Sequence, residues 1–207
     1  METEEEQVEK LKAWLKENGL SIIAGIVIGV GGLGGYRYWD HVQKTTAEQA
    51  SSHFTQMIEA LDASNSDDVQ QHARALIDEY STTEYAVMAH FAMAKSYLSN
   101  REYEKAEESL RQVVGSAGQE PLGYLARTRL AAVQMQRELY DQAIMTLQID
   151  FPGSFAARVD ELRGDIYSRQ GNSAAAIQAY RKAQQGTPGP ANIEFLQQKL
   201  EDLGTTG

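Results

Sequence analysis

The longest apolar stretch of the chain runs from residue 19 to residue 36, eighteen residues without a charge. In a helix it would cover about 27 Å, slightly less than a hydrocarbon core of about 30 Å. Tyr36, Tyr38 and Trp39 suit the headgroup level, and Lys16 and Arg37 can extend their charged ends into the interface. The pattern therefore predicts one transmembrane helix over residues 19–39.

Three other interpretations of this stretch compete with a membrane anchor. A cleaved secretory signal has a basic leader, whereas the leader here is long and acidic, although Gly32 and Gly34 could mimic a cleavage site. A buried helix of a soluble protein would be weakened by seven glycines in eighteen residues. A nucleotide-binding loop would match G-x-G-x-x-G at Gly29, Gly31 and Gly34, but no β-α-β pattern surrounds it. The uncleaved anchor is favoured.

The glycines of this stretch form two pairs with a spacing of four. Gly25 pairs with Gly29, and Gly31 with Gly35, so each pair shares one face of a helix. Such faces let a second helix approach closely, which predicts a helix-packing site in the membrane. The alternative is that the glycines merely fill lipid-facing positions, and spacing alone does not decide.

The pattern of residues 1–18 predicts a short amphipathic tail. Val8, Leu11, Trp14 and Leu15 recur at helical spacing between charged residues, which predicts a helix at the membrane interface that Asn18-Gly19 can interrupt before the span. The alternative is a frayed tail that only the membrane orders. Three lysines precede the span within this tail, against Arg37 and Lys44 after it, which favours a cytoplasmic N-terminus and a far-side location for residues 40–207.

After the span the pattern stays helical. Apolar positions predict one helix from about 40 to 63 and a second through residue 80, with a break and a cap near Ser64 to Asp67. The oxygen-rich stretch 62–68 does not fit a calcium loop, because Asp67 stands where glycine is required and Ala73 stands where a bidentate glutamate is required.

The next hundred residues repeat themselves. Two columns of small residues share one register, with steps of 37 and 33: Ala94, Ala131 and Gly164, then Ala106, Ala143 and Ala176. The last copy matches a tetratricopeptide repeat through Gly164, Tyr167, Gly171, Ala176, Tyr180, Ala183 and Pro188. The sequence therefore predicts an all-α protein: one transmembrane helix followed by a tetratricopeptide-repeat-like α-solenoid. Repeats lie near 87–116, 124–151 and 157–188, and a C-terminal cap helix spans 190–203 with the stripe Ile193, Leu196, Leu200 and Leu203.

The inner face of the solenoid is the candidate partner groove. First-helix positions predicted to line it present apolar side chains in two copies, at Met88, Phe91, Leu98, Leu125 and Met135, and charged ones such as Glu161 and Asp165 in the third. The alternative is that these residues cover neighbouring helices or loops. The fourth repeat position, usually large and apolar, is His90, Arg127 or Asp160 here, so the packing should be less regular than in consensus repeats.

Composition and motifs exclude several function classes. The net charge is −10 and the pI is near 4.9, which argues against nucleic-acid binding. Cysteine is absent, so thiolate catalysis, disulfides and cysteine metal sites are excluded. His41, His53, His72 and His90 look scattered, and neither H-E-x-x-H nor G-x-S-x-G occurs. We therefore expect no catalytic residue, metal site, cofactor or small-molecule substrate.

Three segments together resemble the YfgM family, ancillary subunits of the bacterial SecYEG translocon. They are AWLKENG at 13–19, the glycine-rich span closing with Tyr36-Arg37-Tyr38-Trp39, and VDELRGDIYSRQGN at 159–172. The resemblance implies a single-pass inner-membrane protein with a cytoplasmic N-terminus and a periplasmic tetratricopeptide-like domain. It further implies as partners the translocon and a membrane-anchored periplasmic chaperone of the peptidyl-prolyl isomerase class (PpiD type).

Two functions follow from this resemblance. The favoured one is a non-enzymatic interaction subunit at the translocon that helps pass secreted or outer-membrane proteins to periplasmic chaperones. The alternative is a regulatory membrane protein that restrains an envelope-stress response regulator through its cytoplasmic tail.

Overall fold

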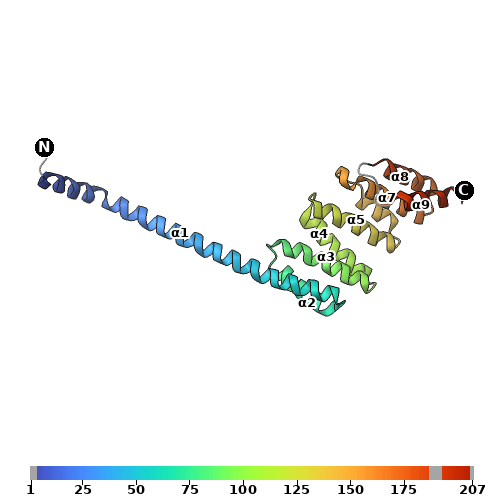
Figure 1. Cartoon of the computed structure of the whole chain (residues 1–207), viewed down its shortest axis with the longest axis horizontal. Coiled ribbons are helices and arrows are strands. Elements are labelled where there is room, and N and C mark those ends of the chain that lie inside the picture. Colours follow the sequence, from blue (N-terminus) through green and yellow to red (C-terminus); the bar gives the residue numbers. More distant parts are fainter. Residues whose placement is uncertain (1–3, 187–192, 206–207) are drawn as a thin grey trace. The chain divides into compact units, whose positions relative to one another are not determined.

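The structure, a computed structural model, describes residues 4–186 and 193–205, and all regular secondary structure in these residues is α-helical (Figure 1). The all-α prediction is confirmed. Residues 190–192 of the predicted cap, Pro188 of the last repeat and residues 1–3 of the predicted tail lie outside the described residues. In chain order the helices are α1 (Glu4–Asp62), α2 (Ser66–Asp78), α3 (Glu84–Ser99), α4 (Tyr103–Ala117), α5 (Pro121–Gln136), α6 (Tyr140–Thr146), α7 (Gly153–Arg169), α8 (Ser173–Gln185) and α9 (Ile193–Thr205).

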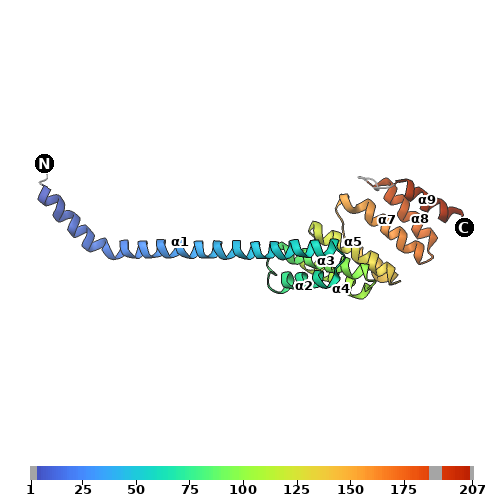
Figure 2. The same cartoon turned by 60° about the horizontal axis from the view of Figure 1, so that its bottom comes forward.

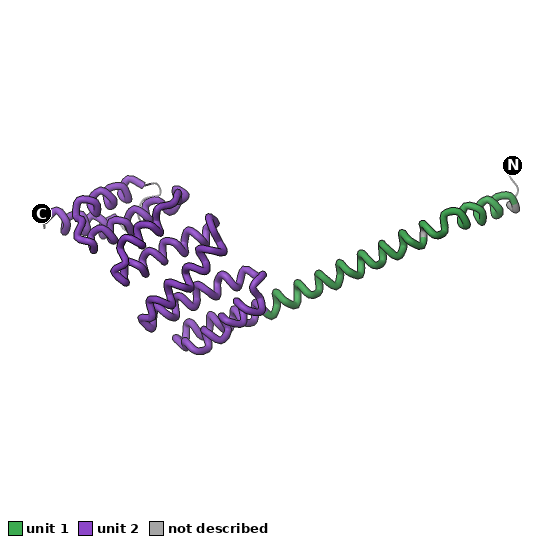
Figure 3. Tube along the Cα trace, turned by 180° about the vertical axis from the view of Figure 1, so that it is seen from behind, with its two compact units in different colours: residues 1–49 green, residues 50–207 purple. Residues whose placement is uncertain are grey.

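The chain divides into two compact units, residues 1–49 and 50–207 (Figure 3). The described part of the first unit is helix α1 up to residue 49. This helix is not interrupted at Asn18-Gly19, where the sequence suggested a break, and the amide of Asn18 donates instead to the Trp14 carbonyl oxygen at 3.0 Å. The helix bends at residue 22 (Figure 2).

Within the described residues, no single straight helix is both long and apolar enough to cross a bilayer. Two segments of α1, Glu6–Ser21 and Ile23–Asp62, meet at a bend of 43° and together satisfy that requirement by length and composition.

The second unit stacks its helices in chain order (Figure 1). Four apolar clusters hold it together, each shared by consecutive helices: the end of α1 with α2 and α3, then α3 to α5, then α5 to α7, and finally α8 with α9. No hairpin encloses a core by itself, so each one depends on its neighbours. Both columns of small residues lie inside: the five alanines are at most 2% exposed, and a Cβ on Gly164 would meet the Tyr180 ring.

Each helical hairpin turns through one residue in the left-handed conformation. These residues are Ser64, Arg101, Glu138 and Gly171, with φ between +56° and +79°. Their steps along the chain equal those of the repeats, with one further step of 37 at the N-terminal end. The hairpin of α1 and α2 is therefore built in the same register as the three recognisable repeats, although its sequence has diverged.

Side-chain caps begin two of the second helices. Asn65 accepts from the Asp68 N–H at 3.4 Å before α2, and Asn172 accepts from the Ala175 N–H at 3.1 Å before α8. Each cap satisfies one of the backbone N–H groups that a helix start leaves without an intrahelical partner.

Candidate interaction surfaces

The glycine faces of α1 are open. A Cβ added at Gly25, Gly29, Gly31 or Gly35 would meet nothing within 4 Å, so no described part of the chain packs on either pair. The large apolar residues around them are exposed as well, among them Leu20, Ile23, Ile26, Val27, Ile28, Val30 and Leu33. A helix that is apolar on all sides requires an apolar environment or a partner helix. The open glycine faces therefore suit either a partner helix or direct contact with lipid.

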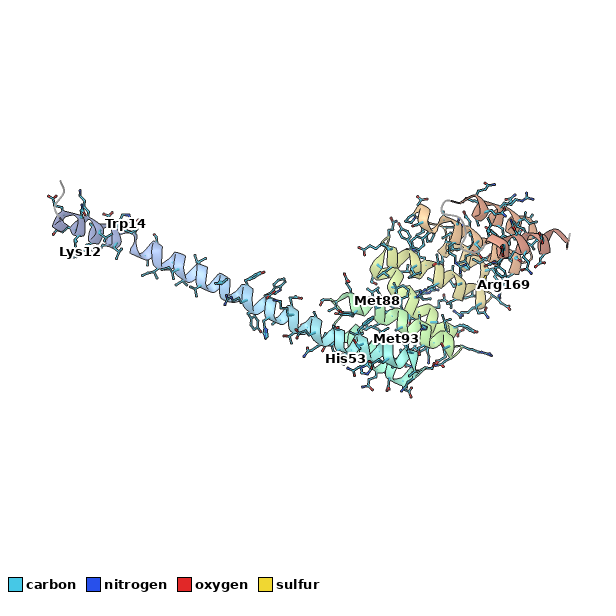
Figure 4. All side chains as sticks on the ribbon, viewed as in Figure 1. Lys12, Trp14, His53, Met88, Met93 and Arg169 are labelled. Carbon is cyan, nitrogen blue, oxygen red and sulfur yellow. The ribbon has the colours of Figure 1, made fainter. Side chains whose placement is uncertain are left out.

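The start of α1 carries the predicted amphipathic pattern. Residues 6–18 are helical, and Val8, Leu11, Trp14 and Leu15 all expose about half of their surface or more. Trp14 is labelled in Figure 4. None of these four belongs to an apolar cluster of the described residues. Their face is thus available to a membrane surface or a partner.

The predicted partner groove is only partly accessible. Met88 and Leu98 on α3 are 38% and 37% exposed, but Phe91 between them is 8% exposed and belongs to the cluster of α3 to α5. The Arg129 guanidinium of α5 lies 5.0 Å from the Phe91 ring centre and covers it. The burial of Phe91 favours the alternative interpretation, in which its ring packs against neighbouring helices.

Two further groove residues are intermediate in exposure. Leu125 packs against the cluster of α3 to α5, and Met135 packs against the cluster of α5 to α7. Of the five predicted groove residues, only Met88 and Leu98 are exposed, and the exposed Lys95 lies between them in sequence. Met88 is labelled in Figure 4.

In the third copy, helix α9 holds the charged residues of α7. Lys199 contacts Asp165 at 2.7 Å and Glu161 at 3.0 Å, and its ammonium lies 4.7 Å from the Phe195 ring centre. The Tyr180 hydroxyl donates to Asp165 at 2.7 Å, and burial together with this bond raises the pKa of Tyr180. Glu161 and Asp165, expected on a free inner face, are ion-paired to α9 instead.

Helix α9 also packs by its apolar residues. Leu196 is fully buried in a cluster with Tyr180, and Leu200 and Leu203 pack against that cluster. Ile193, the first residue of the predicted stripe, is 48% exposed. The helix covers the end of the array through three of its four stripe residues.

A buried carboxylate joins α4 to α5, and no sequence pattern indicated it. Glu107 is 3% exposed and accepts from Gln134 Nε2 at 3.1 Å, from Arg111 Nε at 3.2 Å and from Arg137. Burial raises the pKa of Glu107, but these hydrogen bonds outweigh burial and hold the pKa below its usual value. The charge is fixed and neutralised, as suits a structural network rather than proton transfer.

Two of the polar residues at the fourth repeat position, Asp160 and His90, lie in different surroundings: the first in ion pairs and the second beside a groove. Asp160 of α7 is buried and contacts Arg163 at 2.8 Å and Lys182 at 3.3 Å. His90 of α3 is half-buried, and burial lowers its pKa while Glu108 opposes the shift. It lines a groove of about 330 Å³ with residues of α2, α3 and α4: Arg74, Ile77, Met93, Tyr97, Glu108 and others.

Two of the histidines meet, contrary to the sequence interpretation. His53 of α1, labelled in Figure 4, and His72 of α2 face each other with their Nδ1 atoms 3.2 Å apart, and the centre of the Tyr80 ring lies 5.6 Å from the centre of the His53 ring. His53 lies eleven residues before the turn at Ser64 and His72 lies eight residues after it, so antiparallel pairing of the two helices places them within about one helical turn of each other. Among the described residues, no three or more His, Cys, Asp or Glu side chains converge as metal ligands.

The chain is similar over nearly its full length to several characterised proteins. A family model described as a tetratricopeptide repeat-like domain matches residues 12–205. The "Ancillary SecYEG translocon subunit" of Haemophilus influenzae is 35% identical over 186 residues, 88% of this chain and 89% of that protein. The proteins of the same name from Escherichia coli and Neisseria gonorrhoeae are 30% and 24% identical over 202 residues, at least 97% of each chain.

Proposed function

The chain belongs to the YfgM family of ancillary SecYEG translocon subunits, with its tetratricopeptide repeat-like domain, and we propose that it is a non-enzymatic interaction subunit of the bacterial inner membrane. In this proposal it associates with the SecYEG translocon and a PpiD-type chaperone, and helps pass emerging chains to periplasmic chaperones. The observation that carries the proposal is the similarity to two proteins of that name over 88% and 98% of this chain.

The two units supply the surfaces that this function needs. The apolar, glycine-rich part of α1 supports a membrane span over residues 19–39, because its described large apolar side chains are exposed and its glycine faces contact no other described part of the chain. The helical array supports protein binding, the usual use of such solenoids. In the proposal residues 1–18 are cytoplasmic and residues 40–207 are periplasmic.

A first experiment tests the membrane contact. Gly25→Leu with Gly29→Leu enlarges one open face, while the control Gly34→Leu adds one leucine about 180° around the helix from Gly25. After mild solubilisation, the double variant should recover less translocon than the wild type, and the control should recover a normal amount. Equal recovery by all three proteins would show that the Gly25 face does not hold the partner.

A second experiment tests the periplasmic contact. Met88→Asp with Leu98→Asp changes the exposed apolar residues of α3, whereas Phe91→Asp would place a charge inside the core and disrupt the fold. The exposed pair should weaken crosslinking to the periplasmic chaperone while the circular dichroism spectrum stays unchanged. Unaltered crosslinking would remove this face from the proposal.

The regulatory alternative depends on the other end of the chain. Its supporting observation is the exposed amphipathic helix of residues 6–18. Replacing residues 1–18 by an unrelated tail should leave translocon recovery intact and abolish any restraint of an envelope-stress regulator. Loss of translocon recovery on this replacement would instead make the tail part of the translocon contact.

A further inference from the structure

The facing histidines of α1 and α2 have the separation of two ligands on one metal ion. Zinc–imidazole bonds of about 2.0–2.1 Å at a tetrahedral angle place the two nitrogens about 3.3–3.4 Å apart. The Nδ1 atoms of His53 and His72 are 3.2 Å apart. Little movement of either helix would be needed to admit an ion.

We propose that His53 and His72 bind a divalent transition-metal ion of the kind that prefers imidazole, such as Zn²⁺. Both histidine residues are partly exposed, so water can complete the coordination of an ion held by two protein ligands. The two helices are joined by a short turn and share a core with Met57, Val69 and Leu76, which fixes the positions of the two histidines before any ion binds. Such preorganisation favours binding by two ligands together.

The competing explanation is a simple hydrogen bond between two neutral rings. That bond requires one ring protonated at Nδ1 and the other at Nε2, because a neutral imidazole carries a single N–H. Metal binding through both Nδ1 atoms requires both protons at Nε2. The proton of one ring therefore moves from its Nδ1 to its own Nε2 through solvent, with no net proton released.

An ion at this site would connect α1 to α2 and stabilise the first hairpin of the array. Because His53 and His72 come from different helices, binding would favour the folded hairpin over any state in which the helices separate. The inference rests on residues of the second unit alone and holds whether or not the proposed translocon role is correct.

Zn²⁺ titration of the purified full-length chain in detergent, without a polyhistidine tag, tests the proposal. Four variants are compared by calorimetry: His53→Gln and His72→Gln, with His41→Gln and His90→Gln as controls. The first two should bind Zn²⁺ about tenfold or more weakly than the wild type, since binding by two ligands is lost, and the controls should not change. Equal binding by all variants would assign the ion to the chain's many carboxylates and overturn the proposal.

Long-range ¹⁵N–¹H NMR of the wild type provides a second readout that does not depend on any variant folding. Zn²⁺ should shift the Nδ1 signals of both rings and leave both protons on Nε2. Unchanged Nδ1 signals at saturating Zn²⁺ would also overturn the proposal.

Discussion

Replacing Gly164 by alanine should destabilise the array, although alanine is the better helix former. Gly164 lies within α7, where an added Cβ would stand 2.3 Å from Cδ1 and Cε1 of Tyr180. The Tyr180 ring has little freedom to withdraw: it is 3% exposed, its hydroxyl is bonded to Asp165, and the ammonium of Lys199 lies 5.5 Å from its centre. Relief of the overlap therefore requires α7 and α8 to separate.

The sign of the change in unfolding free energy for Gly164→Ala follows from the sizes of the opposing terms. In a helix interior, alanine stabilises the helix by about 1 kcal/mol relative to glycine. Overpacking costs about 1–3 kcal/mol, and displacing the ring also endangers the hydrogen bond to Asp165, worth about 1.5–3 kcal/mol because the acceptor is charged. We expect a net loss of about 1–3 kcal/mol, which lowers the unfolding midpoint by about 2–12 °C for a domain of this size.

Gly115 of α4 offers a matched control with the opposite sign. A Cβ there meets nothing within 4 Å, so Gly115→Ala should stabilise by up to about 1 kcal/mol. Thermal and urea unfolding followed by circular dichroism would measure both variants, and Tyr180→Leu should reduce the cost of Gly164→Ala. If Gly164→Ala proves as stabilising as Gly115→Ala, α7 does not pack closely on α8 at this position.

Four further predictions follow from the structure. Leu196→Ala should cost about 2–5 kcal/mol of unfolding free energy, whereas the half-exposed Ile193→Ala should change it little; equal effects in urea unfolding would contradict the burial of Leu196. The pKa of Glu107 is depressed in the folded state, so Glu107 stabilises the fold above the usual glutamate pKa, and this stabilisation is lost as pH falls through the folded pKa. Glu107→Gln should therefore flatten the dependence of the unfolding free energy on pH below about pH 5, and an unchanged dependence would refute this. Arg101→Gly should raise the thermal midpoint, because the left-handed turn costs a non-glycine residue about 1 kcal/mol; a lowered midpoint would show that the arginine side chain matters more. A reporter active only outside the cytoplasm should work when fused after Gly207, and activity only at the N-terminus would reverse the proposed topology.

The repeats were predictable because a crossing of two helices tolerates only small residues. The alanines and Gly164 stand at a fixed spacing for that reason, and the structure buries all of them. The hairpin of α1 and α2 has no such signature, and only its left-handed turn at Ser64 shows the shared register.

The surfaces were less predictable because they depend on what neighbouring helices cover. Nothing near Phe91 in the sequence indicates that Arg129 of α5 lies over its ring. Likewise the charges of Glu161 and Asp165 suggest a solvated face until Lys199 of α9 is placed against them. Such contacts between residues far apart in the sequence depend on how the helices stack, which apolar periodicity does not encode.

The short helix α6 should set the place at which the array of helices opens. It contains seven residues, and its only buried residue is Ala143, whereas the second helices of the other repeats have thirteen or more residues. In a stack where each layer is stabilised only by its neighbours, the shortest layer is where cooperativity is weakest. Amide hydrogen exchange should therefore divide the array into two blocks with distinct opening free energies, one ending at α5 and one beginning at α7. A protease acting on the native protein should cut first between residues 147 and 152.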